Sequence, residues 1–187
     1  MNRDDWNTRY AEQELVWSAG PNRFLVSETE GLPPGRALDL ACGEGRNAIW
    51  LAERGWQVTA VDFSDIAVDK GRARNGEIDF VVADVLEYDP GEETFDLVIV
   101  FYLQLPAGEL ERVLRKAASA VAPGGTFLLV GHDLRNLTEG HGGPQDAAVL
   151  YRAEDVPAAL PGLEVVRAEP VDRDGAVDAL VRATRSL

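Results

Sequence analysis

The chain has 187 residues, of which 45% are hydrophobic and 27% are charged, a composition typical of a globular protein with an apolar core. Acidic residues outnumber basic residues by 32 to 18, and the net charge of −14 disfavours a nucleic-acid partner, because an acidic surface repels a polyanion. The single cysteine excludes an internal disulfide framework and a cysteine-rich zinc site, so we expect no metal. No apolar run is long enough to span a membrane, and Met1–Asp5 lacks an apolar signal core, so we expect a cytoplasmic protein with no membrane partner.

An amphipathic helix is predicted first, over Asp4–Trp17, because aromatic residues recur along it. Five apolar runs follow, and each is nearly continuous rather than alternating, which is typical of parallel strands covered on both faces. These runs are Ala37–Ala41, Gln57–Phe63, Ile78–Asp84, Phe95–Tyr102 and Thr126–His132.

Helical patterns separate the strands. Gly45–Arg54 predicts one helix, Ser64 is the N-cap of a second that runs to about Arg74, and Ala107–Ala120 predicts a third. The link between Asp84 and Phe95 is too short for a helix, so we expect a turn there. The alternation predicts an α/β fold with right-handed crossovers and a doubly wound sheet in a single domain over 1–187.

The final third has a different pattern. Leu134–Ala148 is rich in glycine and polar residues and reads as a long loop, and Ala153–Leu160 as a short helix. Two strands, Leu163–Val171 and Ala176–Arg185, flank the hairpin signal Asp172–Gly175.

A glycine-rich turn follows the first strand and opens a helix. Gly43 and Gly45 allow the backbone to approach a ligand, and with Ala48 they also satisfy the dinucleotide pattern G-x-G-x-x-A. Acidic residues lie within the first strand and at the ends of the next two, at Asp39, Asp62 and Asp84. A carboxylate after the second strand can accept both hydroxyls of a ribose, so the turn and these acids together predict a nucleotide-like cofactor.

The run Leu38–Ala48, Leu-Asp-Leu-Ala-Cys-Gly-Glu-Gly-Arg-Asn-Ala, resembles the class I S-adenosylmethionine-dependent methyltransferases, and is similar to their small tellurite-resistance and thiopurine-type branch. Val58–Ser64, Val81–Val85 and the terminal hairpin extend the resemblance. It implies a Rossmann-like, seven-stranded, mostly parallel sheet in the order 3-2-1-4-5-7-6 with the last strand antiparallel, and an N-terminal lid over residues 1–30. Ala41 departs from the fullest form of the family motif, which has glycine there.

The resemblance also implies a binding residue for each part of S-adenosylmethionine. Gly43, Gly45 and Asp39 would hold the methionine portion, with Arg46 as a possible partner of its carboxylate and the Phe101 backbone facing its ammonium. Asp62 would bind the ribose, and the adenine would meet Phe63, Asp84 and the Val85 amide. The aromatic rings expected near the sulfonium belong to Trp6, Tyr10, Trp17 and Tyr102.

The acceptor is expected to be a small molecule with a heteroatom nucleophile: a thiol, a hydroxylated or nitrogen heterocycle, or an oxyanion. Residues 134–148 would form the substrate-side loop, and His132 and His141 are candidate catalytic bases, although a loop histidine is often only solvated. The product would be S-adenosyl-L-homocysteine, the role detoxification or secondary metabolism, and the assembly a monomer or homodimer. Two alternatives stay open: an NAD-binding oxidoreductase module and a non-catalytic cofactor-binding protein.

Overall fold

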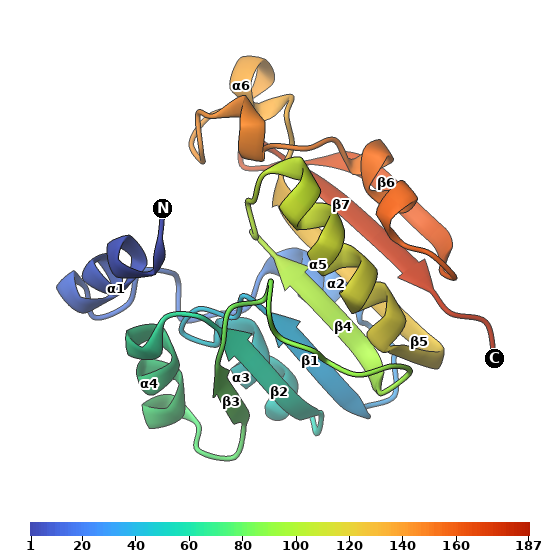
Figure 1. The fold of residues 1–187 in the computed structure, drawn as a ribbon, viewed down its shortest axis with the longest axis horizontal. Coiled ribbons are helices and arrows are strands. Elements are labelled where there is room, and N and C mark those ends of the chain that lie inside the picture. Colours follow the sequence, from blue (N-terminus) through green and yellow to red (C-terminus); the bar gives the residue numbers. More distant parts are fainter. The chain divides into compact units, whose positions relative to one another are not determined.

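The computed structural model describes all 187 residues, in two compact units, Met1–Asp89 and Pro90–Leu187. In the first unit, parallel strands alternate with helices (Figure 1). Its elements are α1 (Arg3–Glu12), α2 (Arg23–Glu28), β1 (Arg36–Leu40), α3 (Arg46–Ala52), β2 (Gln57–Asp62), α4 (Asp65–Arg74) and β3 (Asp79–Val82). β1 pairs with β2 and β2 with β3, so the carboxyl ends of all three strands lie at one edge.

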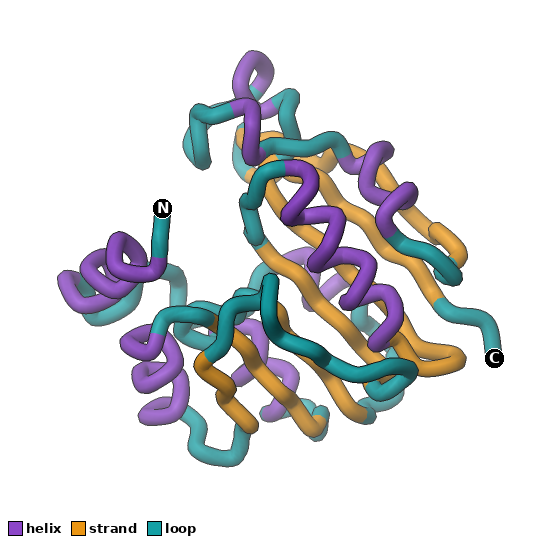
Figure 2. Tube along the Cα trace, in the orientation of Figure 1, coloured by secondary structure: helices purple, strands orange, loops and turns teal.

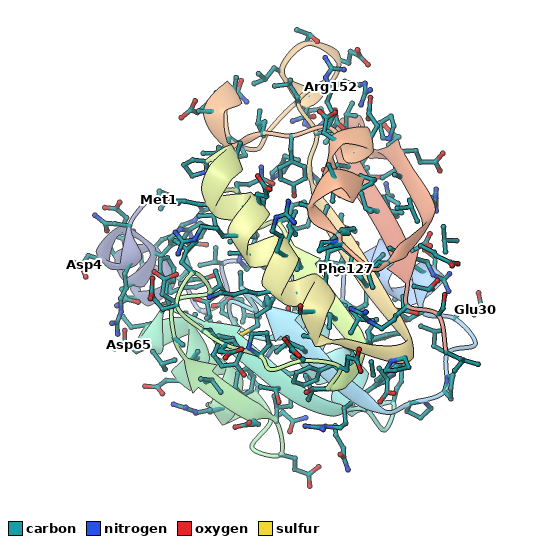
Figure 3. The ribbon with its side chains drawn as sticks, turned by 45° about the vertical axis from the view of Figure 1, so that its right-hand side comes forward. Met1, Asp4, Glu30, Asp65, Phe127 and Arg152 are labelled. Carbon is teal, nitrogen blue, oxygen red and sulfur yellow. The ribbon has the colours of Figure 1, made fainter.

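The second unit combines a parallel strand pair with an antiparallel hairpin. Its elements are β4 (Phe95–Phe101), α5 (Ala107–Ala120), β5 (Val121–His132), α6 (Asn136–Glu139), the 3₁₀ segments η1 (Ala147–Val149) and η2 (Ala153–Ala159), β6 (Glu164–Arg173) and β7 (Ala176–Thr184). β5 lies between β4 and β7, and helix α5 crosses the face of β4 (Figures 1 and 2). Phe127, at the middle of β5, is fully buried in this core (Figure 3).

The seven strands follow the order β3-β2-β1-β4-β5-β7-β6, and β7 is antiparallel to both of its neighbours. The α/β class, the mostly parallel sheet and the strand order are therefore confirmed. None of the helices combines the length and the apolar sequence that crossing a membrane requires.

Two predicted elements were wrong in extent. The first helix ends at Glu12 rather than Trp17, because Gln13 is extended and the backbone beyond it bonds to side chains far along the chain. The segment Leu134–Ala148 is not an irregular loop throughout, since it contains α6 and most of η1. The buried side chain of Asn136 holds this segment in place. Its Oδ1 accepts from the Val177 amide at 2.8 Å, and its Nδ2 donates to the Gly142 carbonyl at 2.8 Å.

The terminal hairpin is confirmed. Arg173 pairs with Ala176, so the turn itself is the dipeptide Asp174-Gly175, with φ values of 54° and 85°. Two consecutive positive φ angles are the signature of a type I′ turn, for which Asp-Gly is a favoured sequence.

Candidate functional site

The glycine turn links β1 to α3 through left-handed backbone. Ala41, Gly43 and Gly45 have φ values of 62°, 55° and 76°. A Cβ atom on Gly43 would lie 2.7 Å from the Tyr10 hydroxyl, and one on Gly45 would lie 2.7 Å from the Phe80 ring. Both glycines are therefore required by backbone conformation and by space. At Gly45 that space is taken by the core, whereas at Gly43 it is taken by the N-terminal segment.

Asp39 lies beneath this turn, inside β1, with 1% of its surface exposed. Its Oδ2 atom is buried and has no hydrogen-bond partner. Burial and the nearby charge of Asp62 raise the pKa of Asp39 to about 8, against the opposing effects of Arg46 and the Ala48 amide. A buried carboxylate oxygen with no partner is costly, so this position is suited to an incoming donor or cation.

Asp62 connects the end of β2 to the glycine turn. Its Oδ2 accepts a hydrogen bond from the Gly43 amide at 2.8 Å, and its Oδ1 accepts one from the Ser64 amide at 2.9 Å. Burial raises the pKa of this carboxyl, while those backbone amides act against the shift. Since each carboxylate oxygen can accept more than one hydrogen bond, the group retains capacity for further donors.

Three of the four aromatic residues predicted near the cofactor, Trp6, Tyr10 and Trp17, gather over the glycine turn, whereas Tyr102 belongs to the second unit. The Trp6 ring lies 5.6 Å from that of Tyr10 and 6.3 Å from that of Trp17, and Trp17 Nε1 donates to the Tyr10 hydroxyl at 3.3 Å. The Arg9 guanidinium lies 5.2 Å from both indole rings. Tyr10 is buried, which raises the pKa of its hydroxyl and keeps it neutral. This aromatic cluster, Trp6, Tyr10 and Trp17, contacts the glycine turn through Tyr10.

The sequence did not reveal what holds the aromatic cluster in place. Glu44, within the glycine turn, is 3% exposed, and its Oε2 accepts from the amides of Val16 and Trp17. Its Oε1 pairs with Lys70 Nζ at 3.2 Å, and Lys70 also donates to three backbone carbonyls, those of Tyr10, Gln13 and Glu14. No local pattern could have joined these residues, because Glu44 and Lys70 are 26 positions apart.

The start of α1 is held separately. Asp65, at the start of α4, accepts from Asn7 Nδ2 at 2.8 Å and pairs with Arg3 at 3.2 Å. Helix α4 therefore fixes both ends of the N-terminal helix through its own first turn and through Lys70.

The other residues predicted to bind the cofactor make no hydrogen bond to Asp39. Arg46 is half-buried and donates to the Ser18 hydroxyl at 3.0 Å, while Phe63 is half-buried after β2. Asp84 is exposed, and its Oδ1 accepts from the Leu86 amide at 2.9 Å, so it stabilises the turn that includes the half-buried Val85. In the second unit, Phe101 is buried at the end of β4.

The second unit holds a polar cluster, defined here as Tyr102, His132, Arg173 and Asp178. Asp178, on β7, is fully buried, and its Oδ2 accepts from the Tyr102 hydroxyl and from Arg173 Nε, each at 2.7 Å. His132 Nδ1 lies 3.6 Å from Asp178 Oδ1, and the His132 ring centroid is 5.0 Å from that of Tyr102. Tyr102 has a φ of 55°, a strained conformation for a bulky residue.

The two histidines predicted as bases are in different surroundings. His132 belongs to the polar cluster at the carboxyl end of β5. His141 is exposed, and its Nε2 lies 3.1 Å from the Asp174 carbonyl in the hairpin turn. The structure therefore does not bring them together.

Comparison with known proteins shows a similarity over the part of the chain that contains the glycine turn. Residues 37–125 match the family described as "Methyltransferase domain". This part of the chain, slightly less than half of its length, is therefore similar to methyltransferase domains. The matched residues include Asp39, the glycine turn and Asp62, so the matched part contains the core of the candidate site.

Two curated relatives are each 30% identical to the chain. The demethylmenaquinone methyltransferase of Renibacterium salmoninarum matches over 130 residues, which cover 67% of the chain and 55% of that relative. The ribosomal RNA small subunit methyltransferase C of Alcanivorax borkumensis matches over 116 residues, 52% of the chain and 32% of that relative. The chain thus spans only about half the length of the first relative and a third of the second.

Solved structures share the fold along nearly the whole chain. A structure titled for the conversion of a disulfide bond into a thioacetal group during echinomycin biosynthesis has a TM-score of 0.78 at 21% identity, covering 98% of this chain and 91% of its own. Magnesium protoporphyrin IX methyltransferase from Synechocystis, with bound S-adenosylmethionine, has a TM-score of 0.67 at 19% identity, covering 98% and 79%.

Proposed function

We propose that the chain transfers a methyl group from S-adenosylmethionine to a small-molecule heteroatom acceptor. The observation that carries this proposal is the buried, unpartnered Oδ2 of Asp39 beneath the glycine turn. The cofactor is a suitable ligand for that atom, because it carries a cationic ammonium group that can donate hydrogen bonds. Gly43 supplies the close backbone approach that its methionine portion needs, and Gly45 supplies the left-handed conformation that completes the turn.

The other residues of the first unit fit the remaining parts of the cofactor. Asp62 retains capacity to accept from the ribose hydroxyls, and Phe63, Asp84 and Val85 follow strands β2 and β3, where the adenine would be held. When bound, the cofactor supplies a methyl carbon already activated by a positively charged sulfur. The protein must then mainly orient the acceptor and exclude water. The aromatic cluster supports both tasks, since its rings attract a sulfonium and shield the turn.

The acceptor in this proposal is small. The net charge of −14 opposes a polyanionic acceptor such as RNA, although one relative is named for ribosomal RNA. Another relative is named for demethylmenaquinone, which is a small molecule and supports this acceptor class. A detoxifying role, as in the tellurite-resistance and thiopurine-type branch, remains part of the proposal.

The proposal is tested by turnover against a panel of thiols, phenols, nitrogen heterocycles and tellurite, with S-adenosylmethionine as donor. Thermal-shift measurements with S-adenosylhomocysteine and NAD accompany the panel. Stabilisation by S-adenosylhomocysteine, no stabilisation by NAD, and methylation of at least one compound are the expected results. Stabilisation by NAD alone would favour an oxidoreductase module, and cofactor binding without any turnover would favour a non-catalytic binding protein.

Asp39→Asn provides the residue-level check, with Asp69→Asn as a matched control. Asp69 is highly exposed and only pairs with Arg72 on the same helix. We expect Asp39→Asn to abolish the shift with S-adenosylhomocysteine and the control to retain it. Equal shifts in both variants would remove Asp39 from the site.

A further inference from the structure

The polar cluster of the second unit has two features that its own packing does not explain. The hydroxyl of Tyr151, which lies close to Asp178 and Tyr102, is buried without a hydrogen-bond partner. Tyr102 also keeps a left-handed backbone that is costly for a tyrosine. Unpaired buried polar atoms and backbone strain both gather at sites that act on a ligand.

Asp178 is the centre of the cluster. Burial opposes its ionisation, but the polar interactions with His132, Arg173 and Tyr102, in that order of size, hold the pKa of this carboxyl below its usual range. Arg173 donates through Nε at 2.7 Å and approaches through Nη2 at 3.4 Å, so the negative charge is fixed in place. An anionic carboxylate 3.6 Å from Nδ1 favours the imidazole tautomer that carries its proton on Nδ1.

The Nδ1 edge of His132 is also closed to ligands. A Cβ atom on Gly143 would lie 2.8 Å from both Nδ1 and Cε1, and Asn136 holds the neighbouring Gly142 carbonyl. Nε2 makes no hydrogen bond, and the His132 side chain as a whole keeps 15% of its surface exposed. The only nitrogen of His132 open to a ligand is therefore the one that the Asp178 charge leaves unprotonated.

Gln104 sets the position of the His132 backbone. Its Oε1 accepts from the His132 amide at 3.0 Å, and its Nε2 donates to the Val149 carbonyl at 2.7 Å. The ring is thus fixed at the carboxyl ends of β4 and β5, where ligands of open α/β sheets bind.

We propose that the polar cluster is the acceptor site for a hydroxylated aromatic ring, with His132 as the base and Asp178 as its positioning residue. This inference rests on the proposed function. The acceptor O–H bond breaks as a proton passes to Nε2 of His132, forming an N–H bond. The electron pair left on oxygen would form the bond to the methyl carbon, while the bond from that carbon to the sulfonium sulfur would break and leave its electron pair on sulfur as a neutral thioether. The rings of Tyr102 and His132 favour an aromatic acceptor over an aliphatic alcohol.

The tautomer of His132 tests the positioning role without any acceptor. The chain has two histidines, so an imidazole ¹⁵N spectrum contains two rings, and His141→Ala assigns them. We expect the Nδ1–H form for His132 in the wild type and a shift toward the Nε2–H form in Asp178→Asn. An Nε2–H tautomer in the wild type would overturn the inference even if the variant failed to fold.

The chemistry is tested with two probes, phenol, which keeps its proton at pH 8, and thiophenol. At pH 8 thiophenol is a thiolate and needs no base, so we expect Asp178→Asn to lower phenol methylation about 10- to 100-fold and thiol methylation less than twofold. Tyr102→Phe, which keeps the ring, should show the same selectivity with a smaller loss. Equal losses with both probes would make the cluster merely structural.

The wild type separates the two proposals. If it binds S-adenosylhomocysteine but methylates only the thiol, the inference fails and the proposed function stands. If it does not bind S-adenosylhomocysteine, the proposed function itself fails.

Discussion

Burial of the Asp39 carboxyl lowers the stability of the folded chain, and no contact within the fold fully offsets this loss. Its carboxyl is buried with one unpaired oxygen, and its pKa is raised from 3.8 to about 8. Between these two values the unfolded chain has lost the proton and the folded chain retains it. The folded state therefore binds more protons, and this residue lowers the stability progressively as pH rises from about 4 to about 8.

The first prediction follows from that sign. Urea unfolding at pH 5 and pH 8 should show that the wild type loses at least about 1 kcal/mol more stability over this interval than Asp39→Asn. The variant lacks the titrating group, whereas the acids that do not interact with Asp39 contribute equally to both proteins. Identical losses in the two proteins would mean that the Asp39 carboxyl is not strained by its burial.

Ala41 is strained for a different reason. It has a φ of 62° at the position where the fullest family motif has glycine. A left-handed conformation costs an L-residue ~1–2 kcal/mol, while glycine adds a backbone entropy cost of ~0.5–1 kcal/mol. Ala41→Gly should therefore stabilise the protein, by up to about 1 kcal/mol in chemical denaturation. A clear loss of stability would show that the alanine is unstrained there.

Among the helices and strands, the sequence correctly predicted the elements that depend only on residues close together in the chain. Nearly continuous apolar runs identified β1 to β5, and the Asp174-Gly175 turn fixed the hairpin of β6 and β7. The glycine turn and Asp39 could be placed together because Asp39 lies in β1 and the turn follows that strand directly. These features depend on neighbouring residues, so one sequence suffices to find them.

The parts that were missed depend on distant contacts. The first helix ends early because Lys70, about 60 positions further on, binds its last carbonyls. The polar cluster depends on a contact between Asp178 and Tyr102, which are 76 positions apart, and no sequence pattern predicts a contact between residues so distant. His132 could be singled out as a histidine at a strand end, but its partner could not.

Lys70 and Glu44 provide the prediction at this scale. Lys70→Gln should raise hydrogen exchange of the Val16 and Trp17 amides at least tenfold, about 1.4 kcal/mol, because Glu44 then lacks its cation and the carbonyls of α1 lack their donor. Lys116→Gln, at the only other lysine, is the matched control and should leave both amides unchanged. Unaltered exchange in Lys70→Gln would show that the lysine does not hold the segment.

For the whole molecule, the acidic charge and the buried carboxylates act in the same direction. A net charge of −14 attracts a cationic ligand and repels a polyanion. Asp39 is the buried carboxyl at which the cationic group of such a ligand would bind. The free protein holds a proton on Asp39 at pH 7. A ligand ammonium at this carboxylate favours its ionised form, so binding must release the proton.

Calorimetric titration with S-adenosylhomocysteine at pH 7, in phosphate and in Tris, tests this account most directly. The two buffers differ in ionisation enthalpy, so the difference between their apparent binding enthalpies counts the protons released. We predict saturable binding with release of close to one proton by the wild type, and no release by Asp39→Asn if that variant still binds. Absence of binding, or binding with the same proton count in both proteins, would contradict the assignment of Asp39 and the glycine turn as the cofactor site.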